Sequence, residues 1–195
     1  MFCGVINVLF AGAALLAPFR PGEVTVGGEV GHRMSVTLGK MLHHTDIEGT
    51  FTRHFRHRKA KPDEPGGFAG YGMFLDALVT AAAHGIGGAE TVRAKTRLLA
   101  ELGELQSPDG RITMFSGAPG FWDSHEGAYL IQALCRDHRW FGTAASLETA
   151  RRLGDALIAD GAFPTLGSET AYLLLYEETK DRRYRDWLEK SAAIG

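Results

Sequence analysis

The sequence predicts an all-α protein made of paired helices, and three observations lead to this fold class. Apolar residues recur at a spacing of three to four along most of the chain, as on the buried face of an amphipathic helix. Short loops containing Gly or Asp separate these segments and end the helices. No stretch alternates between apolar and polar residues for long enough to build a sheet.

The predicted helices follow one another from residue 29 to residue 193. A short β-type run at residues 23–26 precedes them and predicts one strand or an extended arm. Ser168 is predicted to cap the helix that ends at Lys180, and Asp46 to cap the one that ends at Phe55. The predicted ranges are 29–43, 46–55, 68–83, 89–105, 123–137, 146–158, 168–179 and 183–193.

A loose internal repeat groups these helices into pairs. Residues 74–78, 130–134 and 172–176 are similar apolar runs, and each belongs to a helix followed by a short loop and a partner helix. Units of roughly 40–55 residues made of helix pairs indicate stacked α-hairpins, in either a solenoid or a closed α/α toroid. We therefore expect an α-hairpin array.

Composition limits the classes of partner. A net charge of −2 over 195 residues gives no general attraction to nucleic acid or to a membrane surface, so neither is an expected partner. The two cysteines, Cys3 and Cys135, lack a C-x-x-C spacing, so the chain itself predicts no thiol-based zinc site. The compartment stays open, because two unpaired cysteines fit an oxidising or a reducing one.

The chain divides into a leader at residues 1–22 and one domain at residues 23–195. The first nineteen residues carry no charge and resemble a secretory signal, although the basic segment that begins such a signal is absent. A membrane span is disfavoured, because the run is short and contains Gly, Asn and Pro.

A basic segment at residues 53–61 has two interpretations. It is either a patch that binds phosphate or metal, or a solvated helix end. The helix dipole favours cations at a C-terminus, and the histidines do not have the spacing of a metal site, so the sequence favours the solvated end.

The richest segment for function is 121–129, where a predicted helix begins. Asp123 is a natural N-cap, and Glu126, three residues later, would complete a capping box. The indole of Trp122 is a platform on which a sugar ring can stack, and His125 offers hydrogen bonds to hydroxyls. The candidate carbohydrate-binding residues are therefore His125, Trp122, Asp123 and Glu126. No catalytic and no metal-binding residue is predicted.

Five motifs in this order resemble the N-terminal half of the bacterial β-L-arabinofuranosidases, glycoside hydrolase family 127. They are 27–33 (GGEVGHR), 70–72 (GYG), 106–112 (QSPDGRI), 122–129 (WDSHEGAY) and 175–184 (LYEETKDRRY). The resemblance implies an (α/α)₆ barrel with a sugar bound in its mouth. It also implies a zinc-supported cysteine nucleophile and a glutamate acid/base, in a second half of the barrel that lies beyond residue 195.

The resemblance implies a role most clearly for His125, which matches a sugar-contacting histidine of the family. A second sugar-contacting histidine of the family would fall just before Glu169, where this chain has residues 166–168 (LGS), which leaves the sugar open. A six-hairpin barrel needs about twice the helices predicted here. We therefore expect a partial barrel that is inactive alone, with zinc needed only in the complete enzyme. Self-association or a complementing C-terminal half would cover its open side.

Three functions fit the sequence. The first is the substrate-binding half of a glycosidase that acts on carbohydrate. The second is a non-catalytic α-hairpin module that binds glycan or protein, and the third is a fragment of another α/α-toroid sugar enzyme, an epimerase or a lyase.

Overall fold

The computed structural model describes residues 19–60, 70–117, 120–161, 165 and 167–192. Residues 1–18, which make up most of the predicted leader and include Cys3, lie outside the described residues. The helices are α2 (Gly28–His44), a π-helical turn η1 (Glu48–Thr52), α3 (Arg53–Arg56), α4 (Tyr71–Ala83), α5 (Gly88–Leu105), α6 (Phe121–Phe141), α7 (Ala144–Ala159), α8 (Ser168–Thr179) and α9 (Arg182–Ala192).

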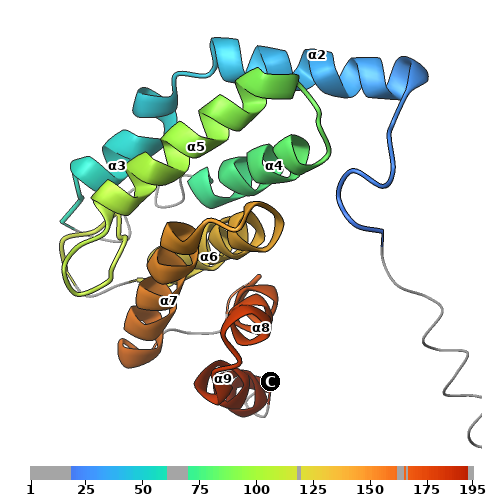
Figure 1. Ribbon diagram of the computed structural model, residues 1–195. Helices are drawn as coiled ribbons and strands as arrows, with labels where there is room; N and C mark the ends of the chain where they lie inside the picture. Colours follow the sequence, from blue (N-terminus) through green and yellow to red (C-terminus); the bar gives the residue numbers. More distant parts are fainter. Residues whose placement is uncertain (1–18, 61–69, 118–119, 162–164, 166, 193–195) are drawn as a thin grey trace, which may run out of the picture.

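The described residues form an array of α-hairpins, as the sequence predicts. The pairs α4–α5, α6–α7 and α8–α9 are stacked in chain order, with α2 and α3 beyond the first pair (Figure 1). Helix α6 packs against both α4 and α8 and so occupies the centre. Arg136 pairs with Asp76 of α4, and Arg139 pairs with Glu177 of α8.

The order of the contacts shows that α4, α6 and α8 run parallel. Gly72, near the start of α4, lies against Leu130, and Asp76, further along α4, lies against Arg136. Contacts between α6 and α8 advance in the same direction. The first helices of the three pairs therefore begin at one end of the array, and their partner helices run back in the opposite direction.

Of the two alternatives for residues 23–26, a strand or an extended arm, the strand is wrong. These residues form a bend followed by irregular chain, and the Arg20 amide donates to the Glu23 carboxylate at 2.7 Å. The β-type composition is not enough, because a strand needs a paired neighbour. Among the described residues the one β-bridge joins Lys59 to Phe115.

Helix positions agree with the periodicity, and the differences lie at the ends. Helix α6 was predicted to end at Asp137 but continues to Phe141, and Gly142 ends it with φ 70°. The predicted start at Phe68 lies outside the described residues, and α4 begins after Gly70, which has φ 75°. Ser168 is the first residue of α8 and not its cap. Its hydroxyl instead accepts from the Thr165 amide at 3.0 Å.

The core is centred on α6 because that helix is buried on two sides. Its apolar residues interlock with those of every neighbouring hairpin, and each buried Leu or Ile contributes about 1.5–3 kcal/mol. Tyr184 of α9 is also fully buried, and its hydroxyl donates to Asp155 at 2.9 Å. The largest fully buried side chains include Tyr71, Leu75, Leu78, Leu98, Leu102, Leu130, Ile131, Leu134 and Leu153.

A buried ion pair joins three helices. Lys95 of α5, only 4% exposed, donates to Asp137 of α6 at 2.5 Å, and the Ser146 hydroxyl of α7 donates to the second oxygen of Asp137 at 2.6 Å. The Lys95 ammonium also lies 3.9 Å from the centre of the Phe141 ring. Asp137 is therefore retained inside α6 because its carboxylate has one partner on α5 and another on α7.

Replacing Lys95 by methionine is expected to destabilise the protein by about 3–5 kcal/mol, because the Asp137 carboxylate would stay buried without its cation. Urea unfolding followed by circular dichroism measures this. Lys190→Met, at an exposed position of α9, is the control and should change the free energy of unfolding by less than about 0.5 kcal/mol. A loss below about 1 kcal/mol for Lys95→Met would contradict a desolvated pair.

Candidate functional site

The start of α6 is built around Asp123, three residues inside the helix. Gly120 is the N-cap, with extended backbone, and its amide donates to the Asp123 carboxylate at 3.3 Å. The other oxygen of Asp123 accepts from the amide of Met114 at 2.7 Å, which fixes the preceding connector to the helix. The prediction that Asp123 is the N-cap is therefore wrong by three residues: Asp123 is the third helical residue, and its carboxylate accepts from the amide of the N-cap.

Glu126 caps a different helix from its own. Its carboxylate is buried and accepts from the amides of Gly70 and Gly72, at 2.8 and 2.5 Å, at the start of α4. The first amides of a helix have no partner within it, and the positive end of the dipole favours a carboxylate there. The predicted box between Asp123 and Glu126 does not form.

Gly72 makes this contact possible. A Cβ atom there would lie 2.5 Å from the Leu130 amide nitrogen, which belongs to backbone and cannot move aside. The absence of a side chain therefore lets α4 approach α6 closely enough for Glu126 to reach the α4 amides.

An aromatic cluster projects from the first two turns of α6. The rings of Trp122 and Tyr129 meet the His125 imidazole edge to face, with centroids 5.8 and 5.3 Å away, and Phe121 stacks on His125 at 6.0 Å. Trp122 is 39% exposed and Phe121 is 54% exposed. These four residues are here called the aromatic cluster, and Phe121 and Trp122 are its exposed members.

The aromatic cluster lies on a face shared by α4, α6 and α8. Asp76 and Glu177 meet arginines of α6 across this face, so Met73 and Leu173, one turn earlier on their helices, lie on it too. Met73 and Leu173 are each about half exposed. We call this surface, aromatic at its N-terminal end and charged at its C-terminal end, the inner face.

The electrostatics of this end favour neutral groups. Burial lowers the pKa of His125, so its imidazole is uncharged at neutral pH and can both donate and accept. Burial raises the pKa of Asp123, and the hydrogen bonds from Met114 and Gly120 oppose that shift. The exposed surface here is therefore suited to a neutral polar ligand with an apolar face.

The four sequence-predicted residues thus separate into two pairs. Trp122 and His125 contribute to the inner face, whereas Asp123 and Glu126 are buried and bind backbone amides. Sequence reasoning missed Phe121 and Tyr129 as members of the same surface. Their spacing from His125, four residues on either side, was the available signal, since such residues share a helix face.

Residues that would activate a nucleophile or hold a metal are not assembled in the described part of the chain. Cys135 is buried, and burial raises the pKa of its thiol to about 12, so it is not a thiolate. Over the same residues, no group of three or more His, Cys, Asp or Glu side chains is placed to hold a metal ion. The described residues therefore offer no set of donors that fits the zinc implied by the resemblance.

Comparisons with known proteins do not assign the chain to a family. No family model matches it, and no curated protein matches it. None of the described helices combines the length and the apolar character that crossing a bilayer requires.

Replacing Glu126 by glutamine is expected to cost about 1–3 kcal/mol of stability. The amide offers one acceptor oxygen to the two amides of Gly70 and Gly72 and turns a donor toward them. Denaturant unfolding of the variant measures this cost. Glu104→Gln, at an exposed position of α5, should be nearly neutral, and an equal loss in both variants would argue against capping of α4 by Glu126.

Proposed function

We propose that the inner face is the carbohydrate-binding wall of a glycosidase-type α/α toroid, similar to the β-L-arabinofuranosidases. The observation that carries this proposal is the exposed indole of Trp122 with the neutral imidazole of His125 against it. The apolar face of a sugar ring stacks on an indole, and its hydroxyls need hydrogen-bonding groups at the rim. The substrate class is therefore carbohydrate.

The parallel arrangement of α4, α6 and α8 supports the toroid. In a closed ring of α-hairpins the inner helices are parallel, and their N-terminal ends surround a common mouth. The aromatic cluster lies at that end of α6, beside the starts of α4 and α8. Gln132 of α6 donates to the Gly167 carbonyl at 3.0 Å, which holds the start of α8 next to Tyr129.

The proposed role within such an enzyme is substrate binding. Glycoside hydrolysis generally uses two carboxyl groups on either side of the scissile bond. Asp123 and Glu126 are buried and already accept from backbone amides, so neither is available to flank a ligand. The cysteine nucleophile, the acid/base and the zinc of the resembling family have no counterpart among the described residues, and no reaction step is assigned to them.

The second candidate, a non-catalytic module that binds glycan or protein, is favoured by the same two buried carboxylates. It would use the inner face without any chemistry. An epimerase or lyase would also place histidines on this face. Only a barrel completed by further residues would act on a sugar, so turnover by such a completed protein separates the two catalytic classes from a binding module.

Trp122→Ala is expected to weaken binding of methyl β-L-arabinofuranoside by at least about fivefold, since loss of aromatic stacking costs about 1 kcal/mol. His125→Ala should weaken binding in the same direction without changing the helical content. Calorimetric titration, or tryptophan emission, gives the affinities. Trp187→Phe, on the half-buried side of α9, is the matched control and should bind as the parent does.

Equal affinity in the parent, Trp122→Ala and His125→Ala would contradict sugar binding at the aromatic cluster. A panel of other pentosides and hexosides in the same titration identifies the sugar. If the wrong sugar was chosen, one member of the panel will bind with the same dependence on Trp122.

The chain of 195 residues is expected not to hydrolyse an aryl β-L-arabinofuranoside, with or without added zinc, because Asp123 and Glu126 bind backbone amides and Cys135 is a buried thiol. Release of the coloured phenol measures this. Zinc-dependent turnover by the purified chain, abolished by a chelator, would contradict the assignment of a binding role.

A further inference from the structure

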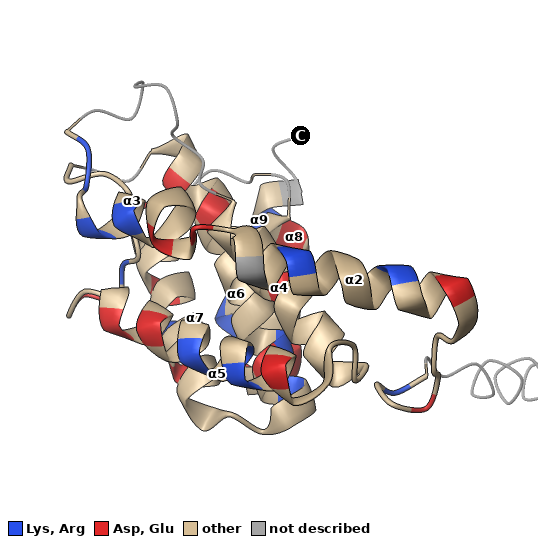
Figure 2. Cartoon of the chain, turned by 90° about the horizontal axis from the view of Figure 1, so that it is seen from above, with Lys and Arg blue, Asp and Glu red and all other residues tan. Residues whose placement is uncertain are grey.

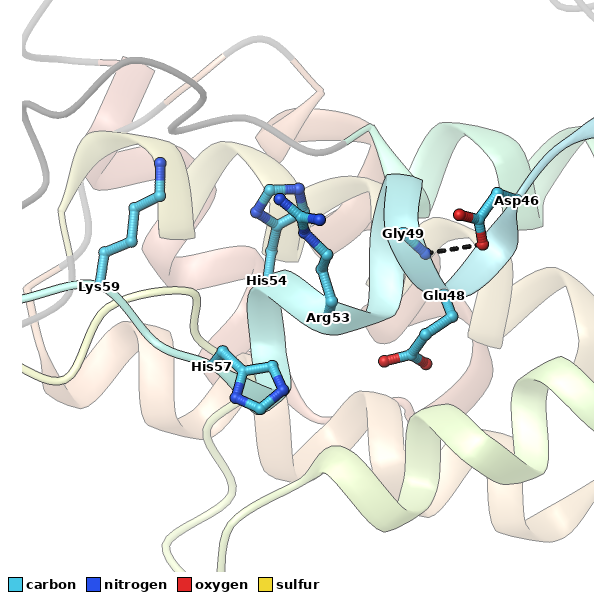
Figure 3. A pocket seen from close by; sticks show the side chains of 7 residues that line it. All are labelled: Asp46, Glu48, Gly49, Arg53, His54, His57 and Lys59. Atoms are coloured by element: carbon cyan, nitrogen blue, oxygen red, sulfur yellow. Dashed lines mark hydrogen bonds between the residues drawn. The ribbon is translucent and has the colours of Figure 1, made fainter.

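A hollow of about 700 Å³ lies on the opposite side of α4 from α6, around η1 and α3. Figure 3 shows its lining side chains, and Figure 2 shows that basic residues gather at α3. The sequence favoured a solvated helix end for this segment. The lining residues are Asp46, Glu48, Gly49, Arg53, His54, His57 and Lys59.

The walls of the hollow are held in place from beneath. Phe51 and Phe55 are buried and pack on Tyr71, with ring centroids 5.5 and 6.1 Å away, which fixes η1 and α3 to α4. At the other end, the Lys59 amide donates to the Met114 carbonyl at 2.9 Å. The cationic side chains therefore project from backbone that is anchored on both sides, so a ligand would not have to order it.

The acidic residues of the hollow are already engaged. Asp46 accepts from the Gly49 amide at 2.9 Å, and Glu48 accepts from the Thr52 hydroxyl at 2.5 Å. Arg56, which is outside the lining, pairs with Glu101 at 2.6 Å. By contrast, Arg53 forms no ion pair with any described residue. Its guanidinium is exposed at the hollow.

Three basic side chains share one side of this segment. Arg53, His54 and Lys59 point the same way in Figure 3, whereas His57 points away from them. Burial lowers the pKa of His54, and the positive charges of Arg53 and Lys59 lower it further. An anion placed among them would offset this mutual repulsion and favour protonated His54.

We propose that this hollow binds the tetrahedral oxyanion of a phosphate or sulfate group, held by Arg53 and His54 with Lys59 at its edge. The planar fork of a guanidinium matches two oxygens of such a group, and imidazolium adds a third charged donor. A metal ion fits poorly, because Arg53, His54 and Lys59 are basic and the lining carboxylates Asp46 and Glu48 already accept hydrogen bonds. Nucleic acid fits poorly, because Phe55 is buried and no Phe, Tyr or Trp side chain is among the described residues that line the hollow for base stacking.

The test is a titration of the purified chain with inorganic phosphate, and separately with sulfate, followed by NMR of backbone amides and histidine rings. Signals of residues 53–59 should shift and saturate. Arg53→Met should weaken the affinity by about tenfold, the usual effect of losing a charge-assisted pair. Arg93→Met, exposed on α5, makes the same change in net charge away from the hollow and should leave the affinity unchanged.

The pH dependence provides a second readout. Sulfate keeps its charge between pH 5 and 8, so its affinity should rise as the pH falls through the pKa of His54, which lies below 6.5. The other charged groups around His54 are Arg53, Lys59, His57, Asp46 and Glu48. His54→Gln should remove the pH dependence that Arg53→Met retains in part.

Equal weakening by Arg53→Met and Arg93→Met would overturn the proposal, because it would show only general charge attraction. Shifts spread over the surface without saturation would overturn it as well. If glucuronate bound more tightly than sulfate and phosphate, the proposal would be wrong about the ligand, which would be a carboxylate and not a tetrahedral oxyanion. If a single-stranded oligonucleotide bound more tightly than either ion, and if Arg53→Met weakened that binding, the ligand would be nucleic acid and not a small oxyanion. Circular dichroism of each variant confirms that the helices are intact.

Discussion

The close approach of α4 to α6 at Gly72 is the constraint on which the rest of the structure depends. A side chain at this position would collide with the backbone of Leu130, so the spacing of the two helices is possible only with glycine. The approach also brings the Glu126 carboxylate to the first amides of α4. Packing and capping therefore act together, because the same contact buries the apolar sides and satisfies the polar helix end.

This constraint also determines what the inner face offers. Because Glu126 and Asp123 are occupied by backbone amides, the exposed groups at the start of α6 are aromatic and neutral. Such a surface suits the apolar side of a sugar ring better than it suits acid/base chemistry. The proposal of a carbohydrate-binding wall follows from this division between buried carboxylates and the exposed Trp122.

The hollow around η1 and α3 depends on α4 in a different way. Phe51 and Phe55 pack on the side of α4 that faces away from α6, and this packing places Arg53 and His54 at the surface. The two surfaces thus differ in charge and lie on different sides of one helix. A change that weakens one of them need not affect the other, so they can be studied separately.

The sequence by itself determined the fold class and the position of most helices, because helical periodicity and glycine loops are local signals. Residues 89–105, for example, were predicted within one residue of α5. Tertiary structure alone decided the role of Glu126, whose partners are more than fifty residues away in the chain. It also decided that Asp123 is the third helical residue and not the N-cap. It also decided the hollow around Arg53. Contacts between distant segments leave no periodic pattern, so only the folded chain reveals them.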